Sequence, residues 1–256
     1  MLGAVIGDIV GSPFEFDPYK NTDFELFRSD ADFTDDTVCT VAVADWVNRG
    51  CQDNLAVILQ NWCRRYPNPK GAYGARFREW IFSENPQPYG SWGNGSAMRV
   101  SAVGWAFDNL DDVLHYAGQS AAVTHNHPEG IKGAQAVAAA VYWARKGRDK
   151  AFIRRQIADR FGYDLNRNCD DIRPNYRFDE SCMGTVPQAL IAFLDSENFE
   201  HALRLAVSLG GDSDTLAAIT GSVAEAYYQQ IPEDIKKKAL AIVPDEMQEI
   251  LLGMKR

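Results

Sequence analysis

Two short segments, far apart in the chain, combine hydroxyl groups with paired carboxylates. The first reads Thr-Asp-Asp-Thr at residues 34–37, and the second reads Asp-Ser-Asp-Thr at residues 212–215. An apolar run follows each segment, from Val38 in the first case and from Leu216 in the second. Both segments therefore place two carboxylates and a hydroxyl at the expected start of a helix.

Helix capping is the simplest explanation for either segment alone. Asp and Thr at a helix start satisfy free backbone N–H groups and complement the positive end of the helix dipole. One acidic residue suffices for a cap, however, and two adjacent carboxylates repel each other. The same excess at both segments favours a cation site that includes the carboxylates of Asp35, Asp36, Asp212 and Asp214.

The nature of these side chains indicates which cations they would bind. Carboxylates and hydroxyls are ligands of hard ions such as Mg²⁺, Mn²⁺ and Ca²⁺. Four carboxylates can neutralise two such ions, and two metals about 3.5–4 Å apart are a recurring hydrolytic arrangement. Zinc is a weaker alternative, because His125 and His127 have a usable spacing but the chain lacks a Cys-x-x-Cys pair.

A glycine-rich stretch from Tyr89 to Arg99 is suited to a phosphate. Glycines let the backbone approach a ligand closely and expose N–H groups to an anion, and Arg99 could add a charged donor. The stretch lacks the Gly-Lys-Ser/Thr of a P-loop. Its alternatives are an ordinary turn and a structural ion pair for Arg99. His125 could donate to a phosphate or a ribose hydroxyl, or bond locally beside a capping Thr124.

Helical periodicity dominates the elements that must position these groups. It predicts helices over residues 131–146, 186–194 and 199–209, and another from Leu216. Alternating strand patterns are scarce, so we expect an all-α fold in a single domain, residues 1–256. Three glycine- and proline-rich stretches are interpreted as functional loops: Pro67 to Gly74, Asn85 to Gly95, and Tyr163 to Gly184.

Composition excludes several classes of partner. A formal net charge of −9 argues against nucleic acid. Five cysteines, an odd number, argue against a disulfide framework and for a reducing cytoplasm. The apolar opening, residues 1–6, lacks a basic flank and is interpreted as a buried helix. No stretch reaches the roughly 20 apolar residues needed to cross a bilayer, so we expect no membrane partner.

Together, five motifs in this order resemble the ADP-ribosylglycohydrolase family, which includes the dinitrogenase-reductase-activating glycohydrolase. The motifs span nearly the whole chain, and their order is more specific than any of them alone. They are Gly7-Asp8-Ile9-Val10-Gly11 followed by Glu15, Thr34-Asp35-Asp36-Thr37, Gly93-Asn94-Gly95-Ser96-Ala97-Met98-Arg99, Thr124-His125, and Gly210-Gly211-Asp212-Ser213-Asp214-Thr215.

The resemblance implies an orthogonal all-α multi-helix bundle with two Mg²⁺ or Mn²⁺ ions. It makes Glu15 a catalytic or metal-associated glutamate, alongside catalytic Asp35 and Asp36, and it makes Asp8 a structural hydrogen-bonding residue. The implied metal ligands are Thr34, Asp35, Asp36, Asp212, Asp214 and Thr215. The implied diphosphate- and ribose-binding residues are Gly93, Asn94, Gly95, Ser96, Met98, Arg99 and His125.

We therefore expect hydrolysis of the N- or O-glycosidic bond of ADP-ribosylated proteins or small ADP-ribosyl compounds. The alternatives are an inactive ADP-ribose-binding module and a metal-dependent phosphoesterase acting on a nucleotide diphosphate. One departure concerns adenine: many relatives have a stacking aromatic residue where this chain has Ser181-Cys182-Met183. Candidates to replace it are Tyr163, Tyr176 and Phe178.

Overall fold

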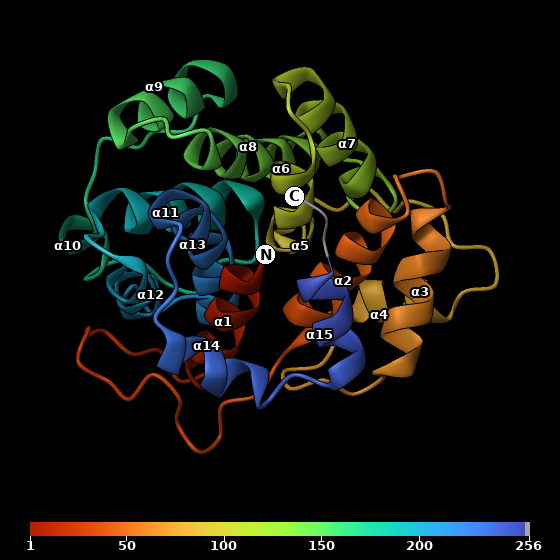
Figure 1. The fold of residues 1–256 in the computed structure, drawn as a ribbon, viewed down its shortest axis with the longest axis horizontal. Coiled ribbons are helices and arrows are strands. Elements are labelled where there is room, and N and C mark those ends of the chain that lie inside the picture. The colour runs from red at the N-terminus through yellow and green to blue at the C-terminus, as the bar shows by residue number, and fades with distance from the viewer. Residues whose placement is uncertain (254–256) are drawn as a thin grey trace.

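The computed structural model of the chain describes residues 1–253. Within these residues, strand-like pairing is confined to two isolated bridges, Thr34 with Lys70 and Gly93 with Ser181. The expected all-α fold is confirmed (Figure 1). Its elements are α1 (Leu2–Gly11), the 3-10 helix η1 (Ser12–Phe14), α2 (Asp35–Asn48), α3 (Leu55–Arg65), α4 (Ala75–Phe82), α5 (Gly95–Met98), α6 (Ser101–Ala106), α7 (Leu110–Ala122), α8 (Pro128–Arg145), α9 (Lys150–Phe161), α10 (Cys169–Ile172), α11 (Cys182–Asp195), α12 (Phe199–Ser208), α13 (Ser213–Tyr228), α14 (Glu233–Leu240) and α15 (Asp245–Leu252).

The predicted helices are present; α12 begins at the predicted Phe199, whereas the other three begin earlier than predicted. The stretch 131–146 is α8, which begins earlier, at Pro128, because His127 caps it by accepting from the Glu129 N–H. The stretch 186–194 is α11, which begins at Cys182, capped by Ser181. The apolar opening of the chain forms the buried helix α1. None of the helices among the described residues combines the length and the hydropathy that a membrane crossing requires.

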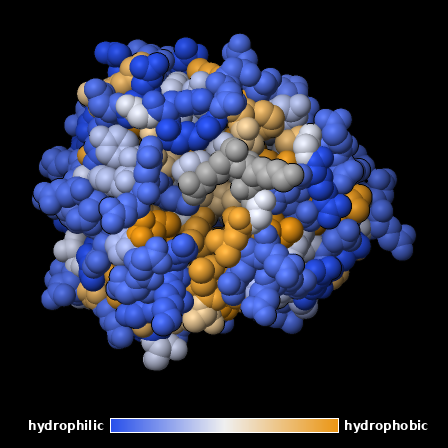
Figure 2. All heavy atoms as spheres, in the orientation of Figure 1, coloured by the Kyte–Doolittle hydropathy of each residue, from blue (hydrophilic) through white to orange (hydrophobic). Residues whose placement is uncertain are grey.

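Helix α13 lies at the centre of the fold. Every residue from Ser213 to Ala224 is buried, and the helix contacts α1, α8, α11 and α12. Alanine, glycine and serine recur along it, so neighbours can approach from several sides. Helices around it run in different directions; in Figure 1, α8 lies crosswise to α3. The face shown in Figure 2 is mostly hydrophilic, with hydrophobic residues gathered near its middle.

The tightest helix contact joins α1 to α13. Gly3, Gly7 and Gly11 recur every fourth residue and therefore lie on one face of α1. A Cβ atom at Gly7 would lie 2.0 Å from the Ala217 carbonyl oxygen, and one at Gly11 would lie 2.3 Å from that of Ser213. The two backbones thus touch directly. This contact fixes the end of α1 against the start of α13.

Substituting Gly7 tests this contact. We expect Gly7→Ala to lower the free energy of unfolding by about 3 kcal/mol or more, because the obstructing atoms belong to a helix backbone and cannot rotate away. Chemical denaturation measures the change. The matched control is Gly118→Ala in α7, where the new methyl would meet side-chain atoms alone, the end of Gln135 at 3.3 Å and Ile131 at 3.7 Å. That control should stay within about 1 kcal/mol of wild type; equal effects at both glycines would contradict the packing argument.

Candidate metal centre and anion-binding cavity

One cavity of about 520 Å³ contains most of the residues that the sequence singles out. Its walls come from the residue after η1, the start of α2, the segments before and within α4, the glycine-rich loop leading into α5, and the start of α13. All three predicted functional loops therefore contribute to it. The loop of residues 163–184 contributes Phe178 and Glu180.

Asp8 holds the start of α2 in place from a position outside the cavity lining. Its buried carboxylate accepts hydrogen bonds from the backbone N–H groups of Thr34 and Thr37, both at 3.0 Å. It also accepts from the Thr34 hydroxyl at 2.7 Å and the Thr37 hydroxyl at 2.5 Å. Asp8 does not line the cavity. Its contacts are those of a structural residue that holds the first acidic segment in place.

The two acidic segments meet. The Thr215 hydroxyl donates to the Asp36 carboxylate at 3.0 Å, across 179 positions of sequence. Asp35, Asp36, Asp212 and Asp214 all line the cavity with Thr215. The Thr34 hydroxyl lies beside them but outside the lining, because it donates to Asp8 and accepts from the Asp36 N–H at 3.1 Å.

Glu15 reaches the same point from a third segment. One carboxylate oxygen each of Glu15, Asp212 and Asp214 lie within 4.8 Å of one another. Among residues 1–253, this is the only such group of three or more carboxylate, thiol or imidazole side chains. The geometry thus brings Glu15 to the second acidic segment, with Asp35 and Asp36 on the adjoining wall.

The cluster is unfavourable for negative charge. Burial raises the pKa values of Asp36 and Asp212 well above their ordinary range, and the charge of Asp214 raises both further. Burial, followed by the charges of Asp214 and Asp8, raises the pKa of Glu15 to about 8. Ionised carboxylates in this cluster need a compensating cation. The donor set, all oxygen, fits hard divalent ions.

The glycine-rich loop is anchored to the segment before α11. The Asn94 N–H donates to the Glu180 carbonyl at 2.7 Å, and the Cys182 N–H donates to the Trp92 carbonyl at 3.0 Å. The Asn94 side chain donates to the Asp212 carboxylate at 2.6 Å and to the Thr185 hydroxyl at 3.0 Å. Asn94 therefore joins the loop to the acidic cluster.

The predicted substrate-binding residues fall into two groups. Gly93, Asn94, Gly95, Met98, Arg99 and His125 line the cavity, whereas Ser96 does not. The Ser96 hydroxyl is buried and donates to the Gly130 carbonyl at 2.7 Å. Arg99 is 1% exposed, and it donates to the Ser120 carbonyl at 2.8 Å and the Thr124 hydroxyl at 2.9 Å. These bonds hold its guanidinium inside the protein.

His125 is held as a neutral imidazole. Its Nδ1 is 2.7 Å from the Thr124 hydroxyl. Burial lowers the pKa of His125 well below its ordinary value, and the Arg99 charge lowers it further. A Cβ atom at Gly95 would lie 3.1 Å from Nε2, so a side chain there would press against the ring. His127 serves as a helix cap, which leaves no support for a two-histidine zinc site.

Several cavity residues were not identified from the sequence. Aromatic Tyr89 and Trp92 lie within the glycine-rich stretch, and Arg76 lies near the start of α4. Of the three aromatic residues considered for adenine, only Phe178 lines the cavity. Its ring stacks on Phe16, with centroids 6.3 Å apart. The sequence signal was available in the loop boundaries, although it did not indicate which loop side chains point inward.

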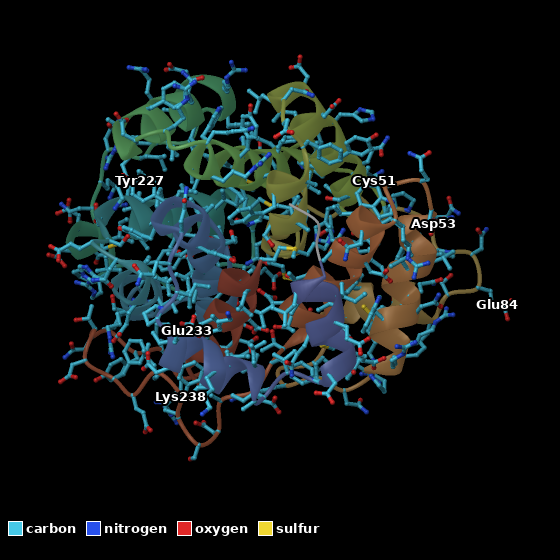
Figure 3. All side chains as sticks on the ribbon, in the orientation of Figure 1. Cys51, Asp53, Glu84, Tyr227, Glu233 and Lys238 are labelled. Carbon is cyan, nitrogen blue, oxygen red and sulfur yellow. The ribbon has the colours of Figure 1, made fainter. Side chains whose placement is uncertain are left out.

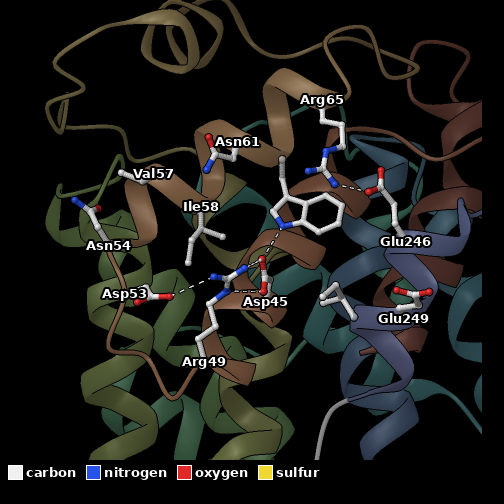
Figure 4. Close-up of a pocket in the computed structure, with 12 residues that line it drawn as sticks. Asp45, Arg49, Asp53, Asn54, Val57, Ile58, Asn61, Arg65, Glu246 and Glu249 are labelled. Carbon is white, nitrogen blue, oxygen red and sulfur yellow. Dashed lines mark hydrogen bonds and ion pairs between the residues drawn. The ribbon is translucent and has the colours of Figure 1, made fainter.

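A second cavity, between α2, α3 and α15, provides a contrast (Figure 4). Its charged residues pair with one another: Arg49 with Asp45 at 2.8 Å, and Arg65 with Glu246. Asp45 also accepts from the Trp62 indole at 3.0 Å. Both arginines of this cavity are thus paired with its carboxylates. The acidic cavity, by contrast, is lined by six acidic residues and two arginines, and among the described residues no ion pair joins them.

The fold and the site define an all-helical protein with a clustered-carboxylate cavity beside a glycine-rich loop. The chain belongs to the ADP-ribosylglycohydrolase family, whose model matches residues 1–253.

Two curated relatives illustrate the family. The ADP-ribosylhydrolase ARH3 of Xenopus tropicalis is 25% identical over 314 residues, covering 93% of this chain and 89% of the relative. The ADP-ribosylarginine hydrolase Tri1 of Pseudomonas putida is 29% identical over 261 residues, covering 89% and 69%. A solved structure described as an ADP-ribosylglycohydrolase-related protein complex matches with a TM-score of 0.69 and 26% identity, covering 94% of this chain and 95% of that one.

The raised pKa values predict an unusual pH dependence in chelator. Burial and the Asp214 charge raise the pKa of Asp8 to about 7 and that of Glu15 to about 8. The folded state therefore binds more protons than the unfolded chain between about pH 4 and pH 8, and its stability falls as pH rises across that window. We expect the chelated protein to melt at least about 3 °C lower at about pH 8 than at about pH 5.

Adding Mn²⁺ should reverse this loss. Because ionised carboxylates bind the cation best, the melting temperature should rise more at about pH 8 than at about pH 5. Asp214→Asn is the control, since removing one charge should flatten the pH dependence in chelator. Equal Mn²⁺ effects at both pH values would contradict the account, as would a chelated protein that gains stability towards pH 8.

Proposed function

We propose that the chain is a metal-dependent hydrolase that releases ADP-ribose by cleaving the N- or O-glycosidic bond between the distal ribose and an acceptor. The acceptor belongs to an ADP-ribosylated protein or a small ADP-ribosyl compound. The observation that carries the proposal is the meeting of Asp36 with Thr215 beside Asp214 in one cavity. Family membership and the names of the two relatives support the same chemistry.

The carboxylates of the cavity would hold two Mg²⁺ or Mn²⁺ ions. Asp35, Asp36, Asp212, Asp214 and Thr215 offer oxygen atoms directly at its wall. The Thr34 hydroxyl keeps one lone pair beyond its bond to the Asp36 N–H. When bound, the ions would neutralise the cluster, hold ribose hydroxyls and lower the pKa of water.

Glu15 is suited to moving a proton. It lies at the edge of the cluster, half-buried, on a segment separate from both acidic motifs. Burial, followed by the charges of Asp214 and Asp8, raises its pKa to about 8. Cations beside it would favour its ionised form, and the carboxylate could then accept a proton from the attacking water. The other carboxylates would also stabilise the positive charge that develops on a ribose ring during glycosidic cleavage.

Neutral His125 and the glycine-rich loop would bind the rest of the ligand. Gly93 and Gly95 expose backbone at the cavity wall, where a side chain would obstruct it. The neutral imidazole can donate to a phosphate or hydroxyl without a change in protonation. Asn94 holds the loop against Asp212 and thereby positions phosphate and ribose relative to the acidic cluster.

Two substitutions test the division between metal binding and proton transfer. Asp35 is partly buried, and its carboxylate has no hydrogen bond to the described residues, so Asp35→Ala should fold normally. We expect it to lose Mn²⁺ affinity and at least about 100-fold in kcat. Glu15→Gln should keep its bound metal and lose roughly 10²- to 10⁴-fold in kcat.

Activity on ADP-ribosyl-arginine and metal titration measure the two effects separately. Glu84→Gln is the control, because Glu84 is exposed and points away from the molecule (Figure 3). Full activity in Asp35→Ala would exclude the two-metal centre. An unchanged rate in Glu15→Gln would exclude its role in proton transfer.

Product analysis separates this function from its alternatives. Intact ADP-ribose is the expected product, whereas a phosphoesterase would yield AMP. Tight binding of ADP-ribosyl-arginine without release of ADP-ribose would indicate a binding module. A panel of arginine-, serine- and O-acetyl-linked ADP-ribose, each with Mg²⁺, Mn²⁺ and chelator, would then identify the preferred acceptor.

A further inference from the structure

The negative charge of the cavity opposes the binding of any phosphate-bearing ligand. Two arginines and six acidic residues line it, the acidic residues being Glu15, Asp35, Asp36, Glu180, Asp212 and Asp214. Even two divalent cations would leave the acidic side chains in excess over the metal charge. A diphosphate carries further negative charge, and like charges in a water-poor cleft repel strongly. A positive group on the ligand side of the wall would favour its binding.

Arg99 is the less available of the two arginines. It is 1% exposed, and its Nη2 donates to Ser120 and Thr124 inside the protein. Burial lowers the pKa of His125, and the Arg99 charge adds to this effect. These two bonds fix the guanidinium in place, so Arg99 cannot turn further towards a ligand without breaking them.

Arg76 is the other arginine, and it is exposed. It donates to the Tyr89 carbonyl at 2.8 Å, and its guanidinium carbon lies 5.0 Å from the centroid of the Tyr89 ring. Within residues 1–253, no carboxylate pairs with it. Arg49 and Arg65 at the second cavity are, by contrast, paired with acidic residues (Figure 4).

Tyr89 places this free charge on the same wall as the glycine-rich loop. The Tyr89 N–H donates to the Thr124 carbonyl at 3.3 Å, and its ring centroid lies 6.1 Å from that of His125. Arg76, Tyr89 and His125 thus follow one another along the cavity wall. The remaining guanidinium N–H groups can bind two oxygens at once, which suits a phosphate.

The start of α4 adds to the positive potential that Arg76 creates at the cavity. Gly74 caps the helix without a side-chain hydrogen bond, and its first turn contains no acidic residue. Gly74 and Ala75 both line the cavity, so the positive end of the helix dipole faces it. An arginine at this end of a helix is electrostatically unfavourable by itself. Its position is explained if a bound anion lies there.

We propose that Arg76 binds the diphosphate of the ADP-ribosyl ligand and holds it against the glycine-rich loop. The proposal rests on the proposed function, because it takes its ligand from it. Arg76 is then a binding residue that sets affinity, with the acidic cluster remaining the centre of the chemistry.

Calorimetric titration with free ADP-ribose in the presence of Mg²⁺ tests the proposal without turnover. Arg76→Gln should raise the Kd roughly 10- to 100-fold, since it removes charge-assisted hydrogen bonds. Arg78→Gln is the matched control: Arg78 is on the same helix, is exposed and carries the same charge, but does not line the cavity. It should change the Kd less than about twofold. Arg76→Lys should give an intermediate value, because lysine keeps the charge but not the planar fork.

The salt dependence of the affinity and the choice of ligand give two further tests. Wild-type affinity should fall with added salt, and this dependence should be weaker in Arg76→Gln. Unchanged ADP-ribose affinity in Arg76→Gln would overturn the proposal, even if the KM for an ADP-ribosylated peptide rose, because Arg76 would then contact the acceptor. Equal losses in Arg76→Gln and Arg78→Gln would also overturn it. A wild-type protein that binds no ADP-ribose would refute the proposed function itself.

Discussion

The direct backbone contact between α1 and α13 is the constraint on which the site depends. Gly11 touches the first residues of α13, and a Cβ there would lie 2.6 Å from the Asp214 Cα. Because the helices cannot separate, the residues after α1 are fixed beside the second acidic segment. Glu15 follows within one turn, and Asp8 on the same helix reaches the first segment. One helix pair thus brings three distant parts of the chain to a single point.

The same contact brings several carboxylates together in the protein interior, where burial disfavours negative charge. Burial and mutual repulsion raise the pKa values of Asp36, Asp212 and Glu15 together. Asp8 offsets part of this cost with four hydrogen bonds, which also hold α2 in register. The remaining repulsion is the kind of local instability that proteins keep at functional sites. Under the proposed function, divalent cations would relieve this repulsion.

The helices and the two acidic segments could be predicted because both signals are local. Periodicity and capping residues predicted the helices, and the paired carboxylates at residues 34–37 and 212–215 indicated that both segments contribute to one cation site. The spacing of Gly3, Gly7 and Gly11 was a further local signal for a close helix contact. The environment of Arg99 could not be predicted, since its burial depends on where α7 ends in space. The role of Arg76 could not be predicted either. An exposed arginine on a helix is common, and only its neighbours in the structure indicate a ligand.

Anomalous scattering from crystals grown with Mn²⁺ would test the central claim most directly. The account predicts two peaks roughly 3.5–4 Å apart, lying between Asp36 on one side and Asp214 on the other. Absence of manganese from this cavity, or peaks confined to surface carboxylates elsewhere, would contradict it.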